Sequence, residues 1–264
     1  MNILEQIIGK KRLEVAERKK IISVSHLEKT DLFHKKTLSL RQFLLDESKT
    51  GIIAEFKRKS PSKGIINNTA TVKEVTAAYA HCGASGISIL TDESFFGGTL
   101  KDLSDGSFNQ VPLLRKDFMI DEYQLVEAKA NGASVILLIA ACLSKREVKD
   151  LSKSATTLGL EVLLEIHNEA ELDHICDEVD LVGVNNRNLK TFSVDINTSL
   201  ELINKIPASK VPITESGISD IAMISTLKKA GYKGFLIGEN FMKEENPATA
   251  FADFVTKLKA QNEA

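Results

Sequence analysis

Two patterns of apolar and polar residues alternate along most of the chain. Short runs rich in Ile, Val and Leu recur between positions 51 and 238, and each is followed by a stretch with apolar residues at helical spacing. Runs that are apolar on both faces are typical of parallel strands buried on both sides. We therefore predict eight strands, at residues 51–56, 86–90, 112–115, 134–139, 161–166, 181–184, 212–214 and 234–237.

Glycine marks the junctions between the predicted helices and the strands that follow them. It stands near the end of a helical pattern in AHCGASGISI (80–89), ANGASVILL (130–138), TLGLEVLL (157–164) and AGYKGFLI (230–237). Glycine adopts the left-handed conformation that ends many helices without a steric penalty. Asp121, which opens the pattern DEYQLVEAKA, is expected to cap the first turn of a helix with its carboxylate.

The number and order of these units predict the fold class. Eight strand–helix units in about 200 residues match an α/β protein of the (β/α)₈ TIM-barrel type. A doubly wound open sheet is the alternative, and we favour it less because no Gly-x-Gly-x-x-Gly or Walker-type loop follows any predicted strand. We predict one barrel domain over residues 1–264, with residues 1–48 as an N-terminal helical extension. The extension covers the barrel, caps its bottom or docks on a partner, and the sequence does not rank these three arrangements.

Composition and charge narrow the range of partners. The 264 residues include 34 Lys and Arg against 36 Asp and Glu, a net charge of −2 with a pI near 6.3. Nucleic-acid and anionic-membrane binders need a clustered excess of positive charge, so we expect neither partner. The longest apolar run, 135–143, is shorter than the roughly 18 to 20 residues that cross a bilayer. The positive charges at 10–20 follow the first apolar stretch, so we expect no secretory signal and a cytoplasmic location.

Several other features receive a structural interpretation. Cys82, Cys142 and Cys176 are odd in number and far apart, so we expect core thiols and neither disulfides nor a zinc site. His167 has no second ligand at metal-binding spacing and is interpreted as a histidine at the solvent edge, so no metal is implied. The charged stretch 10–20 is interpreted as a solvated helix face.

Candidate catalytic residues stand where the predicted strands end, because barrel active sites lie at the carboxyl ends of the strands. Glu55 and Lys57 point the same way across Phe56, so two opposite charges face the interior and need each other or a ligand. Glu165 follows two leucines and is expected to be partly desolvated, which raises a carboxyl pKa toward acid–base duty. Lys116 stands behind Leu113 and Leu114 in the same way.

Glycine turns follow the last two predicted strands, in TESGI (214–218) and LIG (236–238). Glycine lets backbone N–H groups approach an anion closely, and the loops after strands seven and eight often hold phosphate in such barrels. The sequence therefore predicts a phosphate site at these two turns. Phe96, in the pair before Gly97 and Gly98, is either a loop anchor or part of a wall that binds a ring.

The strand ends together resemble a known family. The segments IIAEFKRKSPSKG (52–64), LLRKDF (113–118), LLEIHN (163–168), GVNNRNLKTF (183–192), TESGI (214–218) and FLIG (235–238) are similar in order to indole-3-glycerol-phosphate synthases of tryptophan biosynthesis. The resemblance covers residues 1 to about 260. It implies a lyase without a cofactor that closes the ring of 1-(2-carboxyphenylamino)-1-deoxyribulose 5-phosphate with loss of CO₂ and water.

The resemblance also implies roles for individual residues. Lys116 matches the general acid that protonates the ketone, Lys57 the cation near the substrate carboxylate, and Glu165 the group that transfers protons during dehydration. The resemblance further implies that Glu55, Asn185 and Ser216 orient the reacting groups, and that the substrate-binding residues are Ser60, Pro61, Phe96, Phe118, Arg187, Glu215, Gly217 and Gly238.

The orientation of Glu239, the oligomeric state and two alternative functions complete the sequence-based hypothesis. Glu239 follows the phosphate turn and is expected to point away, because a carboxylate repels phosphate. The family resemblance implies a monomer. The alternative functions are a class I aldolase-like barrel, in which Lys116 forms a Schiff base, and a noncatalytic sugar-phosphate sensor.

Overall fold

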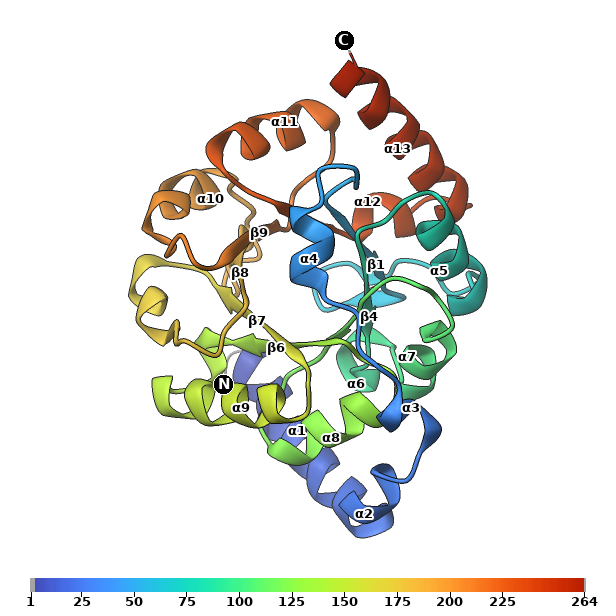
Figure 1. Cartoon of the computed structure of the whole chain (residues 1–264), viewed down its shortest axis with the longest axis vertical. Helices are drawn as coiled ribbons and strands as arrows, with labels where there is room; N and C mark the ends of the chain where they lie inside the picture. The colour runs from blue at the N-terminus through green and yellow to red at the C-terminus, as the bar shows by residue number, and fades with distance from the viewer. Residues whose placement is uncertain (1–2, 264) are drawn as a thin grey trace.

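The computed structural model describes residues 3–263, and its centre is a closed ring of eight parallel strands (Figure 1). Neighbours around the ring follow the order β1-β10-β9-β8-β7-β6-β5-β4. The closed ring confirms the (β/α)₈ barrel and excludes the doubly wound open sheet. The strands are β1 (Ile52–Phe56), β4 (Gly86–Leu90), β5 (Leu113–Lys116), β6 (Val135–Ile139), β7 (Glu161–Ile166), β8 (Leu181–Asn185), β9 (Val211–Glu215) and β10 (Gly234–Ile237).

Strand positions agree with the sequence pattern to within one residue at most ends. The runs at 86–90, 161–166 and 234–237 are strands over those residues. The strand predicted at 212–214 is longer, because Val211 and Glu215 also pair with β8. Polar residues at the ends of β5, β8 and β9 belong to the strands themselves, which brings their side chains to the mouth of the barrel.

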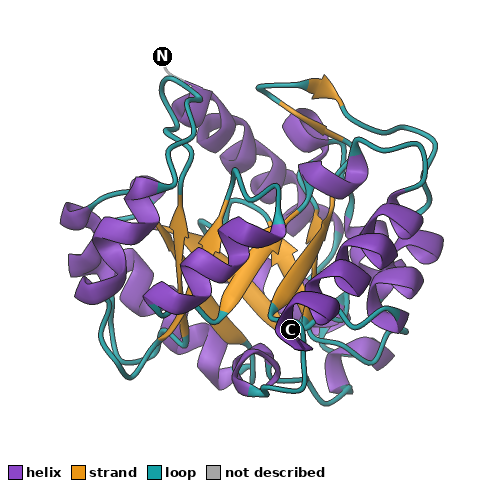
Figure 2. Cartoon of the chain, turned by 90° about the horizontal axis from the view of Figure 1, so that it is seen from above, coloured by secondary structure: helices purple, strands orange, loops and turns teal. Residues whose placement is uncertain are grey.

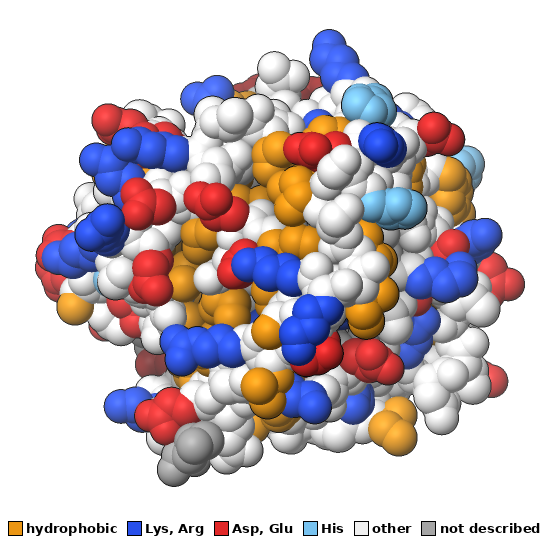
Figure 3. Space-filling model, turned by 90° about the horizontal axis from the view of Figure 1, so that it is seen from below, with side chains coloured by type: hydrophobic (Ala, Val, Ile, Leu, Met, Phe, Trp, Pro, Cys, Tyr) orange, Lys and Arg blue, Asp and Glu red, His pale blue; other side chains and the backbone are white. Residues whose placement is uncertain are grey.

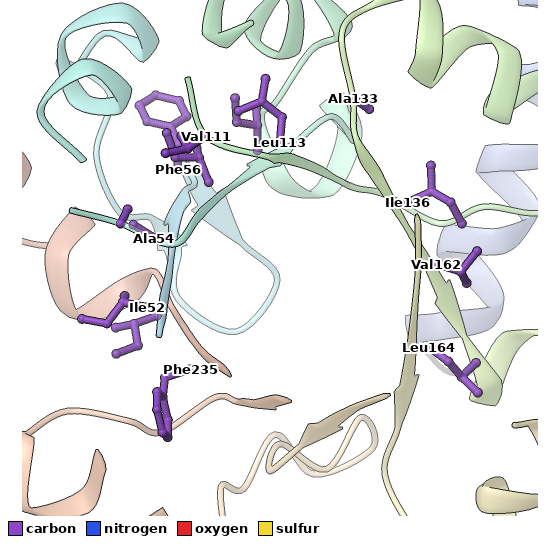
Figure 4. Close-up of a cluster of buried hydrophobic side chains, with 14 of the residues drawn as sticks. Ile52, Ala54, Phe56, Val111, Leu113, Ala133, Ile136, Val162, Leu164 and Phe235 are labelled. Atoms are coloured by element: carbon purple, nitrogen blue, oxygen red, sulfur yellow. The ribbon is translucent and has the colours of Figure 1, made fainter. Parts of the chain in front are cut away.

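Side chains alternate between the inside and the outside of the barrel, as the period of a strand requires. Ile52, Ala54 and Phe56 of β1 point outward into the layer between strands and helices, as Figure 4 shows. Ile53 points inward and packs with Leu114, Leu163 and other residues of the barrel interior. Because both faces are covered by apolar groups, the strands read as continuous apolar runs.

Helices surround the ring and connect its strands. The longer ones are α5 (Val72–His81), α7 (Leu100–Gly106), α8 (Glu122–Ala130), α9 (Lys145–Thr157), α10 (Asn197–Leu202), α11 (Ile221–Ala230) and α13 (Pro247–Glu263). Short helical segments are α6 (Glu93–Phe96), α12 (Glu239–Met242), η1 (Ala140–Cys142), η2 (Glu169–His174) and η3 (Ile203–Lys205). A small hairpin, β2 (Lys59–Ser60) with β3 (Gly64–Ile65), follows β1.

Local capping agrees with the sequence analysis. The Asp121 carboxylate accepts a hydrogen bond from the backbone N–H of Tyr123 at the start of α8, as predicted. Glycines at the predicted junctions have positive φ, at Gly83, Gly132, Gly159 and Gly231. Each follows directly on a helix or its cap, where the left-handed conformation ends the helix.

The N-terminal extension contacts both ends of the barrel. Its helices are α1 (Ile3–Ile21), α2 (Val24–Leu27), α3 (Asp31–His34) and α4 (Leu40–Leu45). Helix α4 lies across the centre of the ring in Figure 1, where Leu40 and Leu44 pack into the bottom of the interior core. Glu161, the first residue of β7, accepts hydrogen bonds from the Ser39 hydroxyl and the Arg41 backbone N–H, which holds α4 there.

Helix α1 lies toward the opposite end. Figure 2 shows the strand arrows pointing toward the end where the β2–β3 hairpin and the first turns of α1 lie. The extension therefore caps the bottom through α4 and reaches the mouth through α1, so two of the three arrangements left open by the sequence occur together.

The charge on the surface and the length of the helices relate to the expectation that neither nucleic acid nor membrane is a partner. On the face shown in Figure 3, Lys and Arg side chains are interspersed with Asp and Glu. Within residues 3–263, no helix is both long and apolar enough to cross a membrane.

Candidate active site

A cavity of about 590 Å³ opens at the carboxyl ends of the strands. Every one of the candidate residues named from the sequence lines it, although they come from seven different loops and strand ends. Convergence of residues so far apart in the chain on one cavity is what a barrel active site requires. These lining residues are Glu55, Lys57, Ser60, Pro61, Phe96, Lys116, Phe118, Glu165, Asn185, Arg187, Glu215, Ser216, Gly217 and Gly238.

The ammonium group of Lys116 is held between two carboxylates. Its Nζ lies 3.2 Å from Oε2 of Glu165 and makes a shorter contact with Oε2 of Glu215. Burial by itself lowers a lysine pKa, but the charges of Glu215, Glu165 and Glu55 outweigh it and raise the pKa of Lys116. Lys116 therefore keeps its proton in the resting site.

The two carboxylates around Lys116 have opposite protonation tendencies. Burial raises the pKa of Glu165, but Lys116, His167 and the amide of Asn185 outweigh it and lower the pKa, so the expectation of a raised pKa was wrong. Burial and the nearby negative charge of Glu165 raise the pKa of Glu215. A pair of close carboxylates with pKa values pushed apart is a common arrangement for acid–base work. The sequence assigned Glu215 only to binding and did not show that it contacts Lys116.

Glu55 and Lys57 face the same cavity and pair with each other at 2.7 Å. This confirms the prediction from strand alternation. Asn185, at the end of β8, donates a hydrogen bond of 3.0 Å from Nδ2 to Oε1 of Glu165, while its Oδ1 accepts one from the backbone N–H of Arg187. Asn185 therefore ties the Glu165 carboxylate to the loop after β8.

The loop after β9 has an unusual backbone. Ser216 has a φ of 70° and Gly217 a φ of 78°, so two consecutive residues lie in the left-handed region. Asn186, which is buried, donates hydrogen bonds from Nδ2 to the backbone oxygens of Glu215 and Ser216 and holds the loop in place. A Cβ atom at Gly217 would lie 2.4 Å from Cγ1 of Val194, so a side chain there collides with its neighbour.

Glu239 does not turn away from the cavity, and that expectation was wrong. Its side chain lines the cavity, with Oε1 3.5 Å from Nζ of Lys63 and Oε2 3.9 Å from NH2 of Arg187. Two cations thus balance its charge beside the predicted phosphate turns. The sequence offered no sign of this, because Lys63 belongs to the distant β2–β3 hairpin region.

One wall of the cavity is apolar. The rings of Phe96 and Phe118 lie 6.1 Å apart between centroids, and Ile3, Leu4 and Ile7 of α1 line the same cavity. The interpretation of Phe96 as part of a wall is therefore the one that the structure favours. The contribution of α1 was missed, although Leu4 and Ile7 stand at helical spacing.

A buried lysine fastens α1 to this wall. The side chain of Lys11 is 1% exposed, and its Nζ lies 2.9 Å from Asp92, 2.9 Å from Asp117 and 3.0 Å from Glu14. Asp92 caps α6, which carries Phe96, and Asp117 directly follows Lys116. The interpretation of residues 10–20 as a solvated face was wrong for Lys11, because Asp92 and Asp117 lie far away along the chain and the sequence pattern does not show that they meet it.

His167 is also not a histidine at the solvent edge, so that interpretation was wrong. Its side chain is 10% exposed, with Nε2 3.2 Å from Oε1 of Glu165 and Nδ1 3.3 Å from Oε2 of Glu171. Burial lowers a histidine pKa, but the two carboxylates outweigh it and raise the pKa of His167 to about 10. The imidazole is therefore positively charged near neutral pH.

The cysteines form no disulfide among the described residues, and no cluster of metal ligands occurs there. Cys82, Cys142 and Cys176 are free and half-buried, so they are less deeply buried than predicted. Among residues 3–263, no group of three His, Cys, Asp or Glu side chains is arranged to hold a metal ion.

Comparison with known proteins identifies the family. The sequence profile of the family described as indole-3-glycerol phosphate synthase matches residues 4–254, nearly the whole chain. The chain belongs to this family. It is therefore an enzyme, a carbon–carbon lyase of tryptophan biosynthesis, as the resemblance of its strand ends implied.

Sequence relatives agree with membership in the indole-3-glycerol phosphate synthase family, and a solved structure agrees with the barrel fold. A synthase of this family from Bacteroides thetaiotaomicron is 46% identical over 259 residues, which cover 98% of this chain and 99% of the relative. One from a Polaromonas species is 40% identical and covers 95% and 97%. The crystal structure of tryptophan synthase subunit alpha from Legionella pneumophila has a TM-score of 0.63 at 13% identity, covering 85% of this chain and 97% of that one. At that identity, it supports the barrel fold alone.

Proposed function

We propose that the cavity binds 1-(2-carboxyphenylamino)-1-deoxyribulose 5-phosphate and closes its ring to indole-3-glycerol phosphate, with Lys116 as the general acid. The observation that carries this proposal is the charged Lys116 ammonium between Glu165 and Glu215, in a cavity with an apolar wall on one side and glycine turns on another. An acid with a firmly held proton, beside two carboxylates, matches a reaction that builds negative charge on oxygen and positive charge on a ring.

The two ends of the substrate match two parts of the cavity. The aryl ring fits the apolar wall of Phe96, Phe118 and Pro61, where Lys57 offers a cation to the ring carboxylate. The phosphate fits the turns at Gly217 and Gly238, with Ser60 and Arg187 nearby. Gly238 lies against Glu55, because a Cβ atom there would be 2.5 Å from Oε1 of Glu55. A side chain at position 238 would therefore collide with Glu55, which explains the glycine at this turn.

The chemistry assigns one task to each charged group. As the ring carbon attacks the ketone carbon, Lys116 donates its proton to the ketone oxygen, and loss of CO₂ returns an electron pair to the ring. Glu165 transfers protons in the dehydration that follows. Glu55, Asn185 and Ser216 orient the reacting groups, and Asn185 already holds the Glu165 carboxylate through its amide.

The raised pKa of Lys116 supports this reaction over a class I aldolase. A Schiff-base lysine must be a neutral amine to attack a carbonyl, and such lysines lose their proton in apolar pockets. Here two carboxylates keep the proton on Lys116. A noncatalytic sensor has no need for this costly buried cluster, in which Glu55, Lys57, Lys116 and Glu165 are all present.

The proposal also includes the oligomeric state and the cellular location of the protein. The monomer implied by the family resemblance remains part of this proposal. The three cysteines are all free, which supports a reducing compartment such as the cytoplasm.

Substitution of Lys116 tests the proposed function. We expect the unaltered protein to form an indole product from the carboxyphenylamino deoxyribulose phosphate, followed by fluorescence, with EDTA present and no added cofactor. Lys116→Met should lower turnover by at least about 10³-fold, within the range of general-acid and electrostatic effects, while substrate affinity changes little.

A matched variant separates loss of the acid from loss of a buried lysine. Lys129 lies on α8 outside the cavity, and burial lowers its pKa. Lys129→Met should keep normal turnover. Normal turnover in Lys116→Met would remove Lys116 as the acid, and a covalent adduct trapped by borohydride would favour the aldolase.

A further inference from the structure

His167 is clamped between a carboxylate of the candidate active site and one outside it. Oε1 of Glu165 faces Nε2, while Oε2 of Glu165 faces Nζ of Lys116. On the other side of the ring, Oε2 of Glu171 lies near Nδ1 and also accepts the backbone N–H of His167 at 2.7 Å. The Nε2–Oε1 contact is an ion pair and not an aligned hydrogen bond. Glu165 thus lies between His167 and Lys116, with one oxygen toward each.

The proposed reaction, on which this inference rests, consumes one proton in each turnover. Lys116 gives one proton to the ketone oxygen, and the new hydroxyl needs a second proton to leave as water. Loss of a C–H proton from the former methylene carbon, which forms the pyrrole double bond, returns one. The balance is one proton taken up, matched by the negative charge that disappears when the ring carboxylate leaves as neutral CO₂.

We propose that His167 is the proton reservoir that recharges Lys116 through Glu165 while substrate fills the cavity. The Nε2–H bond of His167 breaks as an O–H bond forms on Glu165. Rotation of the carboxyl group about its Cγ–Cδ bond then turns this O–H bond from the His167 side to the Lys116 side. The O–H bond breaks there as an N–H bond forms again on the neutral Lys116 amine. The neutral imidazole regains its proton from solvent after the product leaves. His167 does not contact the substrate in this scheme and is a positioning residue that acts through Glu165.

The charges around the ring support this proton transfer. Carboxylates raise the pKa of His167 to about 10 and that of Lys116 above its ordinary value of 10.5, so both groups hold a proton in the resting site. A Lys116 that has given up its proton therefore lies one carboxylate away from a charged imidazolium. Glu165 of β7 and Glu171 of η2 face the ring directly. Beyond Glu165 lie Lys116 and Glu215. From η1, Cys142 contributes a thiol whose pKa is raised to about 12 by burial and by the two carboxylates near His167.

Because Glu165 and Lys116 are buried, a proton stored on His167 is easier for them to reach than a proton from solvent. The side chains of Glu165 and Lys116 are only 5% and 12% exposed before any substrate enters. A substrate in the cavity covers them further, so a proton held on the far side of Glu165 remains within reach. Glu171 keeps that proton on the ring, because it pairs with Nδ1 and is itself fixed by the amide of Asn168 at 2.8 Å.

Single-turnover kinetics with the full chain test the reservoir, with enzyme in excess over substrate and indole fluorescence as the signal. His167→Gln keeps a polar side chain without an exchangeable charge and should slow the rate by about 10-fold or more at pH 7.5, with substrate affinity within about twofold. His167→Ala should be equally slow, and added imidazole should restore its rate with saturation. Glu171→Gln should shift the loss of activity at high pH toward lower pH, because the imidazolium loses a stabilising charge.

A histidine on η2, the short helix that carries Glu171, is the matched control. His174 of η2 is half-buried, but its ring nitrogens contact the backbone oxygens of Glu171 and Leu143 and no carboxylate. His174→Gln should keep the single-turnover rate within about twofold and show no response to imidazole.

The outcomes separate the reservoir from the proposed function. A rate within twofold of normal in His167→Gln, or a failure of imidazole to restore His167→Ala, would overturn the reservoir, since a structural role predicts no rescue. If the glutamine variant does not fold, the shifted pH profile of Glu171→Gln decides the question, and an unshifted profile counts against the reservoir. Absence of any indole product from the unaltered protein would overturn the proposed function itself.

Discussion

Lys11→Met is the substitution that most sharply tests how the N-terminal extension is attached to the barrel. The side chains of Asp92 and Asp117 are 2% and 0% exposed, and Lys11 pairs with both. Methionine has nearly the same length as lysine and removes only the charge. Because both aspartates are out of contact with water, the cost depends on the partners that each keeps.

The structure separates the two aspartates. Asp117 retains Arg115 at 3.0 Å and the hydroxyl of Thr91 at 2.6 Å, so its charge stays compensated. Asp92 retains the hydrogen bond that its carboxylate accepts from the backbone N–H of Phe95 at 2.7 Å, at the start of α6. One buried carboxylate thus loses its counter-charge, which places the loss near the lower end of the usual range, about 3 kcal/mol. For a chain of this size that corresponds to a fall in melting temperature of about 6–12 °C.

Thermal unfolding of three variants checks this value. Lys20→Met is the matched control, because Lys20 lies on the same helix but is 70% exposed and pairs with the exposed Glu17. An exposed pair contributes at most about 1 kcal/mol, so its melting temperature should change little. Lys11→Met combined with Asp92→Asn should recover about half of the loss, because asparagine still caps α6 but carries no charge.

Steady-state kinetics test the attachment of α1 independently of stability. Helix α1 supplies Ile3, Leu4 and Ile7 to the cavity wall, so Lys11→Met should also raise KM more than it lowers kcat. A melting temperature within 2 °C of the unaltered protein would refute the claim that the buried ammonium holds α1. A double variant that is less stable than Lys11→Met alone would refute the assignment of the cost to Asp92.

Two further predictions concern the loop after β9 and the charge on His167. Gly217→Val should raise KM by about tenfold and weaken inhibition by glycerol phosphate, because the new side chain collides with Val194 and the backbone has a φ of 78°; unchanged affinity would place the phosphate elsewhere. His167 has a folded-state pKa near 10 against an ordinary value of 6.5, so the stability it contributes is complete below pH 6.5 and is lost as the pH rises toward 10. Melting temperatures should therefore fall less steeply between pH 7 and 10 in His167→Gln than in the unaltered protein, and equal slopes would contradict a charged His167.

Much of the fold and of the candidate site follows from local periodicity. Runs that are apolar on both faces identified all eight strands, and alternation placed Glu55 and Lys57 on the same side of β1. Polar residues that end apolar runs then marked the mouth of the barrel, because parallel strands end at a common edge. These features depend on neighbours within a few residues, which the sequence displays directly.

Pairing between distant charges was decided only by the tertiary structure. Lys11 looks like one more cation on a charged helix, and His167 like a polar residue after a strand, yet both are buried against carboxylates. The two functions of the extension, with α4 under the barrel and α1 at its mouth, are equally invisible in its helical pattern. The sequence by itself determined which residues face inward and at which end of a strand they lie. Only closure of the barrel decided which charges meet. The direction in which the pKa of a buried group shifts depends on its partners, and closure brings these partners together from loops far apart along the chain.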